Sequence, residues 1–336
     1  IPLGECIALS DFYKKTIGEQ RTNDNNWFTT WNVESWFGVN TVFVDWKYRV
    51  SELLLHRNDL TSSGDATFIQ GATGNNLSGE LTTNFAALPY LKLLRIDDNK
   101  VQWTLPSSIW SVTWLTMLTL SNNKLSGTIP QSWSWLTQLN RLAVNNNLFQ
   151  WALPNIFAGM SSLSNVNIGY NQFSTWLSNL FVLNALQILH GANNMFQWAL
   201  PTQLSALSSL KEIDLSANQF TGALPTNWSA LSNLESLSVS SNTLTWTIPT
   251  SWTALSKLKN VNLSNTNIWW NIGTTIPSWL LIQSLDIQNN NFIGTFTNAF
   301  ENLTWLTSLR VNNNYLDRTV TNNAYVHGDL EQWMDW

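Results

Sequence analysis

One pattern returns along this 336-residue chain at a nearly constant interval, and it constrains the fold more than any other feature. Each unit has apolar residues at its first, fourth and sixth positions, an Asn three residues later, and then alternating apolar and small residues. The unit from Leu210 through Asn218 to Pro225 shows the pattern in full. The step is 24 residues with a single step of 23, and the Asn position recurs at Asn99, Asn123, Asn147, Asn171, Asn194, Asn218, Asn242, Thr266, Asn290 and Asn314.

A repeat of this length predicts a stacked architecture. Two weaker units lie around Asn58 and Asn75, so the chain holds about twelve units in all. A stretch such as Leu210 to Leu215 alternates apolar and polar residues, as a strand with one buried face does. Because a unit of this size cannot bury its apolar side alone, neighbouring units must stack on one another.

This spacing resembles the leucine-rich repeat family, in its plant-like 24-residue subtype with the consensus L-x-x-L-x-L-x-x-N-x-L-x-G-x-I/L-P. The resemblance implies an α/β solenoid, a right-handed curved superhelix with a parallel β-sheet on its concave face and short helical, 3-10 or irregular segments on its convex side. It also implies a ladder of Asn amides, from Asn99 to Asn314, that bond to turn backbone, which suits a side chain with donors and an acceptor. Thr266 can make only part of these bonds.

The resemblance also divides the chain into three parts. Residues 1–49 resemble the family's N-terminal cap, a helix followed by a W-x-G-V strand at Trp36. The usual flanking cysteines are missing, since Cys6 is the single cysteine, so this cap must be held without a disulfide. We expect the repeats to occupy residues 50–320 and a C-terminal cap, truncated where the sequence stops, to occupy residues 321–336.

Candidate catalytic groups do not form a convincing active site. His190, Asp214 and Ser238 share one position on consecutive units, but a catalytic triad needs its base between the nucleophile and the carboxylate. The Asp is central here, so we expect His190 and Asp214 to form a surface ion pair or hydrogen bond. Glu212 and Asp214 have a spacing that suits a glycosidase, yet an open sheet offers no apolar pocket to raise the pKa of one of them. Because no G-x-S-x-G, P-loop or dinucleotide motif occurs either, the sequence predicts that the protein is not an enzyme.

Composition argues against several classes of cofactor and partner. His56, His190 and His327 are too far apart along the units to share a metal, and we expect neither a metal nor another cofactor. Charged residues make up 11% of the chain, the net charge is -5 and no basic run occurs, which disfavours nucleic acid as a partner. No apolar run reaches the roughly 18 residues that a transmembrane segment needs.

The predicted concave face is the expected binding surface. Most of its outward positions, which lie two, four and six residues before each repeat Asn, carry Ser, Asn or Gln. The exceptions are the candidate ligand-binding residues Arg95, Asp97, Arg141, Tyr170, His190, Glu212, Asp214, Asp286 and Arg310. The simpler interpretation is that all of these residues only keep the sheet soluble. A polar, nearly neutral surface nevertheless suits hydrogen bonding to a protein or a glycan, and the resemblance implies that this face binds ligands.

Three functions follow from this surface, in order of preference. The first is a secreted or cell-surface protein that mediates protein or glycan binding or adhesion through the concave face. The alternative is a structural surface component that assembles with copies of itself. A carbohydrate-active enzyme is a distant third.

Tryptophan is in excess in this chain and glycine is scarce. The chain has 21 Trp and 15 Gly, whereas the usual Gly frequency of about 7% would give about 24. Four residues after the repeat Asn, where the consensus has Gly, the chain has mainly Gly or Trp, although no single environment favours both the smallest and the largest side chain. The tryptophans at Trp133, Trp228 and Trp252 differ from these, because they fall on core positions.

We hypothesise that some of these tryptophans are glycine in the native host, encoded by UGA, which variant genetic codes translate as either residue. The subset is Trp103, Trp110, Trp151, Trp198, Trp246 and Trp270. The alternative is an exposed aromatic edge that stacks on sugars or on a partner. With tryptophan present, we expect strained or splayed loops at these positions.

Overall fold

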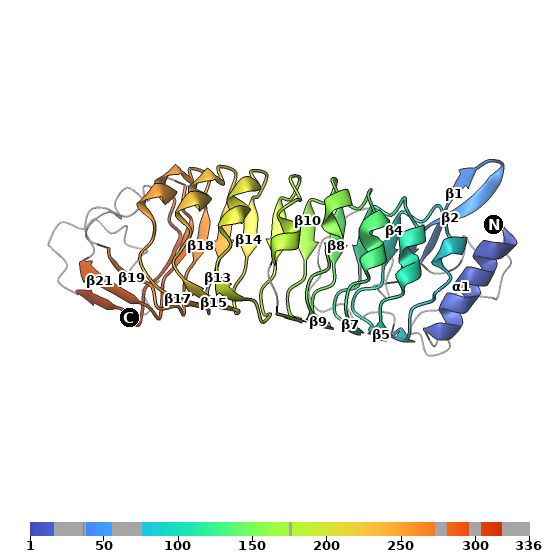
Figure 1. Ribbon diagram of the computed structural model, residues 1–336, viewed down its shortest axis with the longest axis horizontal. Helices are drawn as coiled ribbons and strands as arrows, with labels where there is room; N and C mark the ends of the chain where they lie inside the picture. Colours follow the sequence, from blue (N-terminus) through green and yellow to red (C-terminus); the bar gives the residue numbers. More distant parts are fainter. Residues whose placement is uncertain are drawn as a thin grey trace. The chain divides into compact units, whose positions relative to one another are not determined.

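The computed structural model describes residues 1–16, 36, 38–55, 76–174, 177–272, 281–295 and 304–317. The chain divides into two compact units, Ile1–Phe173 and Ser174–Trp336, and Figure 1 shows the stacked repeats of each. We call each repeat a rung. The predicted features at His56, Asn58 and Asn75, and the C-terminal cap expected over residues 321–336 with His327, lie outside the described residues.

The first unit begins with a helix and a hairpin and continues as rungs. Its helical segments are α1 (Leu3–Lys15) and the 3-10 segments η3 (Phe85–Ala87), η4 (Ser107–Ser111), η5 (Gln131–Trp135) and η6 (Phe157–Gly159). Its strands are β1 (Val39–Val44), β2 (Lys47–Leu54), β3 (Ser78–Gly79), β4 (Leu93–Arg95), β5 (Lys100–Thr104), β6 (Met117–Thr119), β7 (Lys124–Gly127), β8 (Arg141–Ala143), β9 (Leu148–Trp151), β10 (Asn165–Asn167) and β11 (Gln172–Phe173).

Two sheets run through the first unit. In one, β2, β4, β6, β8 and β10 are parallel and in chain order, and β1 pairs antiparallel with β2. In the other, β3, β5, β7, β9 and β11 also follow one another. The register advances by one repeat per strand, so that Leu94 pairs with Leu118 and Leu118 with Leu142. These three side chains are fully buried, which is the inward face that the alternating pattern predicts.

The second unit repeats the same rung. Its 3-10 segments are η7 (Leu177–Leu180), η8 (Thr202–Ala206), η9 (Thr226–Ala230) and η10 (Thr250–Ala254). Its strands are β12 (Ile188–His190), β13 (Gln197–Ala199), β14 (Glu212–Asp214), β15 (Gln219–Gly222), β16 (Ser236–Ser238), β17 (Thr243–Leu244), β18 (Asn260–Asn262), β19 (Trp269–Asn271), β20 (Ser284–Asp286), β21 (Asn291–Thr295), β22 (Ser308–Arg310) and β23 (Tyr315–Asp317). The even-numbered strands form one parallel sheet, and the odd-numbered strands pair in two groups of three. Each unit is therefore an α/β solenoid, as the resemblance predicted.

Polar contacts as well as packing hold the N-terminal helix to the hairpin. Glu5 of α1 is 1% exposed, and its carboxylate accepts hydrogen bonds from Nε of Arg49 (2.5 Å) and from the backbone N–H of Val50 (2.8 Å). Gly38, the glycine of the W-x-G-V motif, has φ +75°. A Cβ at this residue would lie 2.6 Å from the carbonyl oxygen of Leu54. Glycine is required at this position by both conformation and space.

The prediction that Trp133, Trp228 and Trp252 are core residues is confirmed, since all three are 0% exposed. The rings of Trp228 and Trp252 stack with centroids 6.2 Å apart and planes 7° apart. Each indole N–H donates to the proline carbonyl of the preceding rung, Trp228 to Pro201 (3.0 Å) and Trp252 to Pro225 (2.9 Å). The indoles therefore join neighbouring rungs on the side of the 3-10 segments.

The repeat asparagines form a ladder of amides behind the strands. In Asn242, which is 5% exposed, Nδ2 donates to the carbonyl oxygens of Leu215, Val239 and Ser240 at 2.9–3.1 Å, and Oδ1 accepts the N–H of Phe220 at 2.9 Å. Thr266 has one hydroxyl proton, which lies within reach of the carbonyl of Leu263 (3.0 Å) and Oδ1 of Asn290 (2.5 Å). It therefore ties fewer backbone groups than the asparagines do.

We expect Asn242→Ala to lower the free energy of unfolding by about 2–3 kcal/mol, because it leaves buried backbone donors and acceptors without their partner. The midpoint of urea unfolding, followed by circular dichroism, measures the loss. The matched control is Asn233→Ala, which removes an exposed amide that donates to the carbonyl of Ser208. We expect that change to cost less than about 0.5 kcal/mol. Equal losses in the two variants would contradict a special role for the ladder.

Candidate functional site

We call the sheet of even-numbered strands in each unit the main sheet, and its outward side chains stand in columns across the rungs. In the second unit His190 pairs with Asp214 and Asp214 with Ser238, while Glu212 pairs with Ser236. These are the columns that the repeat spacing predicts, because parallel strands in register place equivalent residues side by side. Outward side chains of consecutive rungs therefore lie side by side on this face.

The expected contact between His190 and Asp214 is wrong. Nε2 of His190 lies 2.8 Å from Oε1 of Glu212, two residues before Asp214 on the neighbouring strand. The carboxylate of Asp214 instead accepts the N–H (3.0 Å) and the hydroxyl (2.6 Å) of Ser216 in its own turn. The longer Glu side chain reaches the imidazole, whereas the short Asp side chain is held by its local turn. The column therefore contains no relay from Asp through His to Ser.

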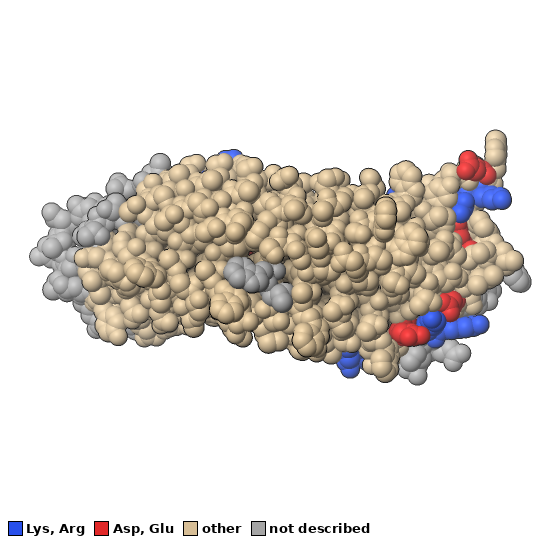
Figure 2. Space-filling model, in the orientation of Figure 1, with Lys and Arg blue, Asp and Glu red and all other residues tan. Residues whose placement is uncertain are grey.

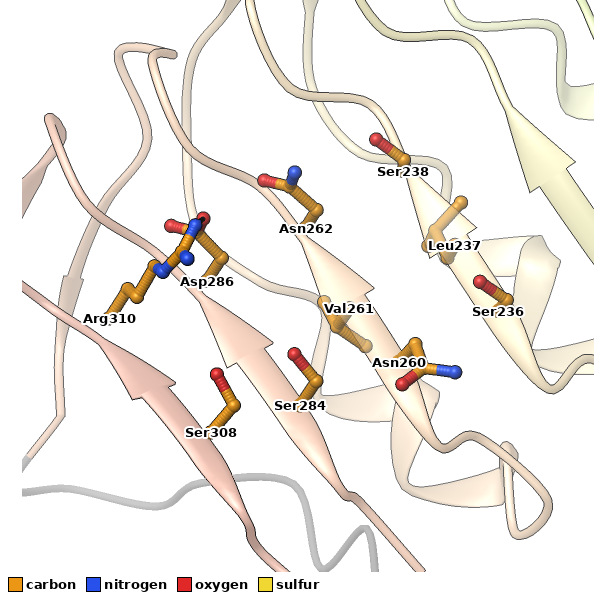
Figure 3. A pocket seen from close by; sticks show the side chains of 10 residues that line it. All are labelled: Ser236, Leu237, Ser238, Asn260, Val261, Asn262, Ser284, Asp286, Ser308 and Arg310. Carbon is orange, nitrogen blue, oxygen red and sulfur yellow. Dashed lines mark ion pairs between the residues drawn. The ribbon is translucent and has the colours of Figure 1, made fainter. Parts of the chain in front are cut away.

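A shallow pocket lies on the main sheet of the second unit (Figure 3). Its volume is about 250 Å³, and its lining residues come from β16, β18, β20 and β22. They are Ser236, Leu237, Ser238, Asn260, Val261, Asn262, Ser284, Asp286, Ser308 and Arg310. Short side chains at Ser236, Ser284 and Ser308 leave this hollow, and its walls offer hydroxyl and amide groups for hydrogen bonding.

One acid and one base mark the end of this pocket. Nη1 of Arg310 lies 3.7 Å from Oδ2 of Asp286, and Figure 3 shows the two side chains pointing toward each other. The side chain of Arg310 is 63% exposed, whereas that of Asp286 is 12% exposed. Burial raises the pKa of Asp286 above its ordinary value, although the N–H of Gln288 and Arg310 oppose this. Arg310 can therefore present guanidinium N–H groups to a ligand while Asp286 holds it in place.

The first unit has a second polar cluster around Asp97. Its carboxylate accepts the hydroxyl of Thr119 (2.5 Å) and the N–H of Ser121 (3.0 Å), and Nε of Arg95 lies 3.9 Å from Oδ2. Burial raises the pKa of Asp97 above 3.8, and the hydrogen bonds and Arg95 lower it by less. Arg141 begins β8 two rungs beyond Arg95 and is half-buried.

Asp97 gives a prediction for pH. Because the folded pKa is raised, the unfolded chain releases this proton first as pH rises, so the contribution of Asp97 to stability is largest in acid and is lost through the interval above 3.8. We therefore expect Asp97→Asn to gain stability over the wild type at pH 7 and to gain less at pH 4. Thermal unfolding of both proteins at pH 7 and at pH 4 measures the difference in stability between them. A gain confined to pH 4 would contradict the assigned direction.

Tyr170 lies away from the outward columns. It directly precedes the ladder residue Asn171, in the turn after β10, with φ +51° and 59% of its surface exposed. The outward positions of that rung are Asn165 and Asn167, on the strand itself. Tyr170 therefore borders the face instead of standing on it. The charged candidate residues did not include Ser284 and Ser308, whose signal in the sequence is a small residue at the same position of two consecutive repeats.

The described residues were also compared with the requirements of a metal site and of a membrane-spanning helix. No group of three or more His, Cys, Asp or Glu side chains in the described ranges is placed to hold a metal ion. None of the helices in the described part of the chain combines the length and apolar character that a bilayer crossing requires. Figure 2 shows one face of the molecule, on which the visible charged side chains gather mainly over α1 and the β1–β2 hairpin.

Solved structures similar to this chain include plant receptors. A plant peptide hormone receptor, RGFR1 in complex with RGF2, is 28% identical with a TM-score of 0.67, covering 72% of this chain and 39% of its own. The ectodomain of the Arabidopsis receptor kinase HAESA with an IDA peptide hormone is 22% identical with a TM-score of 0.77, covering 93% of this chain and 49% of its own. The chain thus spans half or less of the length of these receptors.

A plant ice-binding protein shares the fold at 20% identity and a TM-score of 0.65, covering 94% of this chain and 87% of its own. A comparison with curated proteins found no match. The model of a leucine-rich repeat region matches residues 74–268, which is more than half of the chain, and a single leucine-rich repeat matches residues 281–303. Together with the 24-residue step, the Asn ladder and the parallel sheets, these matches show that the chain belongs to the leucine-rich repeat family.

Proposed function

We propose that this chain is an extracellular or surface recognition module that binds a protein, as an extended segment, through the outward face of its main sheet. The observation that carries the proposal is the pocket on β16, β18, β20 and β22. Its function is recognition without turnover. Adhesion is the setting in which a secreted or cell-surface protein would use such a face.

The chemistry of the pocket supports an extended polar ligand. Its outward columns combine hydroxyls and amides, which pair with either the N–H or the C=O groups of a peptide. Arg310 at one end offers a charge-assisted partner for a carboxylate. A hollow of about 250 Å³ is too small to enclose a folded partner, so the ligand would lie across the rungs.

The similar structures support the same class of ligand. RGFR1 and HAESA are described in complex with peptide hormones, and the sequence of this chain aligns with the former at 28% identity over 72% of its length. Both are receptors, which supports an extracellular setting for this chain. Because the chain spans only part of each receptor, no further receptor activity is proposed for it.

The experiment is a binding selection from a displayed library of random peptides. We expect enriched peptides to bind the wild type and to lose at least about tenfold in affinity, which is about 1.4 kcal/mol, on Ser284→Tyr, because tyrosine fills the pocket without adding charge. The matched control is Ser256→Tyr, at an exposed turn of the same unit. Affinity and circular dichroism are measured for all three proteins.

The outcomes separate the proposed functions. Peptides that bind Ser284→Tyr as tightly as the wild type would contradict the pocket as the site. Peptides that lose affinity for Ser256→Tyr instead would place the site elsewhere. A library without enriched peptides, combined with a positive glycan array, would move the ligand class to glycans. Concentration-dependent assembly of the purified chain would favour the self-assembling surface component, and hydrolysis of an array glycan that Glu212→Gln abolishes would favour the carbohydrate-active enzyme.

A further inference from the structure

Two rows of left-handed backbone run along the rungs. The first is the residue before each ladder position, with φ between 50° and 58° at residues Asp98, Asn122, Asn146, Tyr170, Asn193, Ala217, Ser241, Asn265, Asn289 and Asn313. Six of these ten are Asn, which tolerates this region better than most side chains because it bonds to local backbone. The sequence at this row therefore agrees with its conformation.

The second row lies four residues after each ladder position, and its sequence does not agree with its conformation. Its glycines, Gly79, Gly127, Gly222 and Gly294, have φ from 78° to 96°. Its tryptophans, Trp103, Trp151, Trp198 and Trp246, have φ from 68° to 76°. A bulky side chain is a genuine outlier in this region of positive φ. Four such residues at the same position of the repeat are therefore unexpected.

Space does not require glycine at every position of this row. A Cβ at Gly222 would meet no atom within 4 Å, whereas a Cβ at Gly127 would lie 3.0 Å from the side chain of Thr104. At Gly222 the position therefore admits a side chain, and glycine serves the backbone alone. The four indoles are correspondingly 58–68% exposed. The prediction of strained or splayed loops is thus confirmed at these four positions, and the strain lies in the backbone dihedral angle.

A fifth tryptophan has the same conflict in a different element. Val44 pairs with Lys47 in the β1–β2 hairpin, which leaves Asp45 and Trp46 as a two-residue loop with φ of 49° and 62°. Positive φ at both central residues defines a type I′ turn, for which Asp-Gly is a preferred sequence. Trp46 is 89% exposed, and its edge-on contact with Phe43, with ring centroids 6.4 Å apart, leaves the positive φ in place.

Other tryptophans show no such conflict. Trp110 lies in η4 and Trp270 in β19, neither with positive φ, so the expectation of strained loops is wrong at these two. Trp270 packs edge-on against Phe292, with ring centroids 6.5 Å apart. Backbone conformation therefore separates the five left-handed tryptophans from Trp110 and Trp270.

We infer that Trp46, Trp103, Trp151, Trp198 and Trp246 are glycine in the protein that the native host makes, because the host translates UGA as glycine. The five conflicts then disappear together: four turns regain the residue of Gly127 and Gly222, and the hairpin regains an Asp-Gly loop. The exposed indoles of Trp103, Trp151, Trp198 and Trp246 are then absent from the native protein. The native protein then has the main-sheet face as its ligand surface. This last statement rests on the proposed function.

The test is peptide mass spectrometry of the protein isolated from the organism that carries the gene, together with the codons of that gene. We expect UGA at the five positions and peptides with the mass for glycine. The controls are Trp133, Trp228 and Trp252, for which we expect UGG and the mass for tryptophan. The same digest gives the masses of the peptides with Trp110 and Trp270, whose backbone conformation does not distinguish tryptophan from glycine.

Each outcome decides the inference. UGG codons, or tryptophan masses, at the five positions overturn it, and the indoles then form a displayed edge for stacking on sugars. Glycine at Trp228 or Trp252 would also overturn it, because conformation would no longer separate the two classes. Neither result touches the binding selection with Ser284→Tyr, so failure of this inference and failure of the proposed function remain distinct.

Discussion

Replacing Trp103, Trp151, Trp198 and Trp246 together by glycine is expected to stabilise the chain by about 3 kcal/mol. A left-handed conformation costs an ordinary residue about 1–2 kcal/mol, and glycine loses about 0.5–1 kcal/mol more in conformational freedom on folding. The net gain is therefore about 0.75 kcal/mol per position. Little burial is lost, since each side chain is more than half exposed. The midpoint of urea unfolding measures the gain.

The matched control is Trp135→Gly. Trp135 is 64% exposed, as the four are, but it lies in η5 without positive φ. We expect it to lose about 0.5–1 kcal/mol, because glycine is unfavourable inside a regular segment. If the fourfold variant and Trp135→Gly shifted the midpoint in the same direction, strain in the turns would not be the cause.

The opposite sign is expected for a tryptophan of the core. Trp252→Ala should cost about 3–5 kcal/mol, because it opens a cavity against Trp228 and removes the indole N–H that Pro225 accepts. Urea unfolding followed by far-ultraviolet circular dichroism measures this loss, and a midpoint unchanged from the wild type would contradict it. Trp252→Phe is the conservative control, since other rungs carry Phe157 at the same position, and we expect it to retain most of the stability.

Some features of the fold follow from the repeat, and others depend on local contacts. The core positions of Trp228 and Leu118 followed from the repeat, because a 24-residue period sets which side chains face inward on every rung. The partner of His190 did not, because Glu212 and Asp214 stand at similar distances in sequence and only their side-chain lengths and local turns decide which one bonds. Asp286 and Arg310 could be predicted as candidates from their charge. The pocket that they line with Ser236 could not, because it depends on the small size of serine side chains on neighbouring strands.

Periodicity predicts the family, the solenoid, the Asn ladder and the presence of Trp where the consensus has Gly, because each rung contacts mainly copies of itself. Which of these tryptophans have left-handed backbone follows only from the folded turns, since φ is set there. Trp46 has a positive φ, and Trp110 and Trp270 do not. The tertiary structure also decided where the face is hollow, because a pocket depends on side chains from four rungs at once.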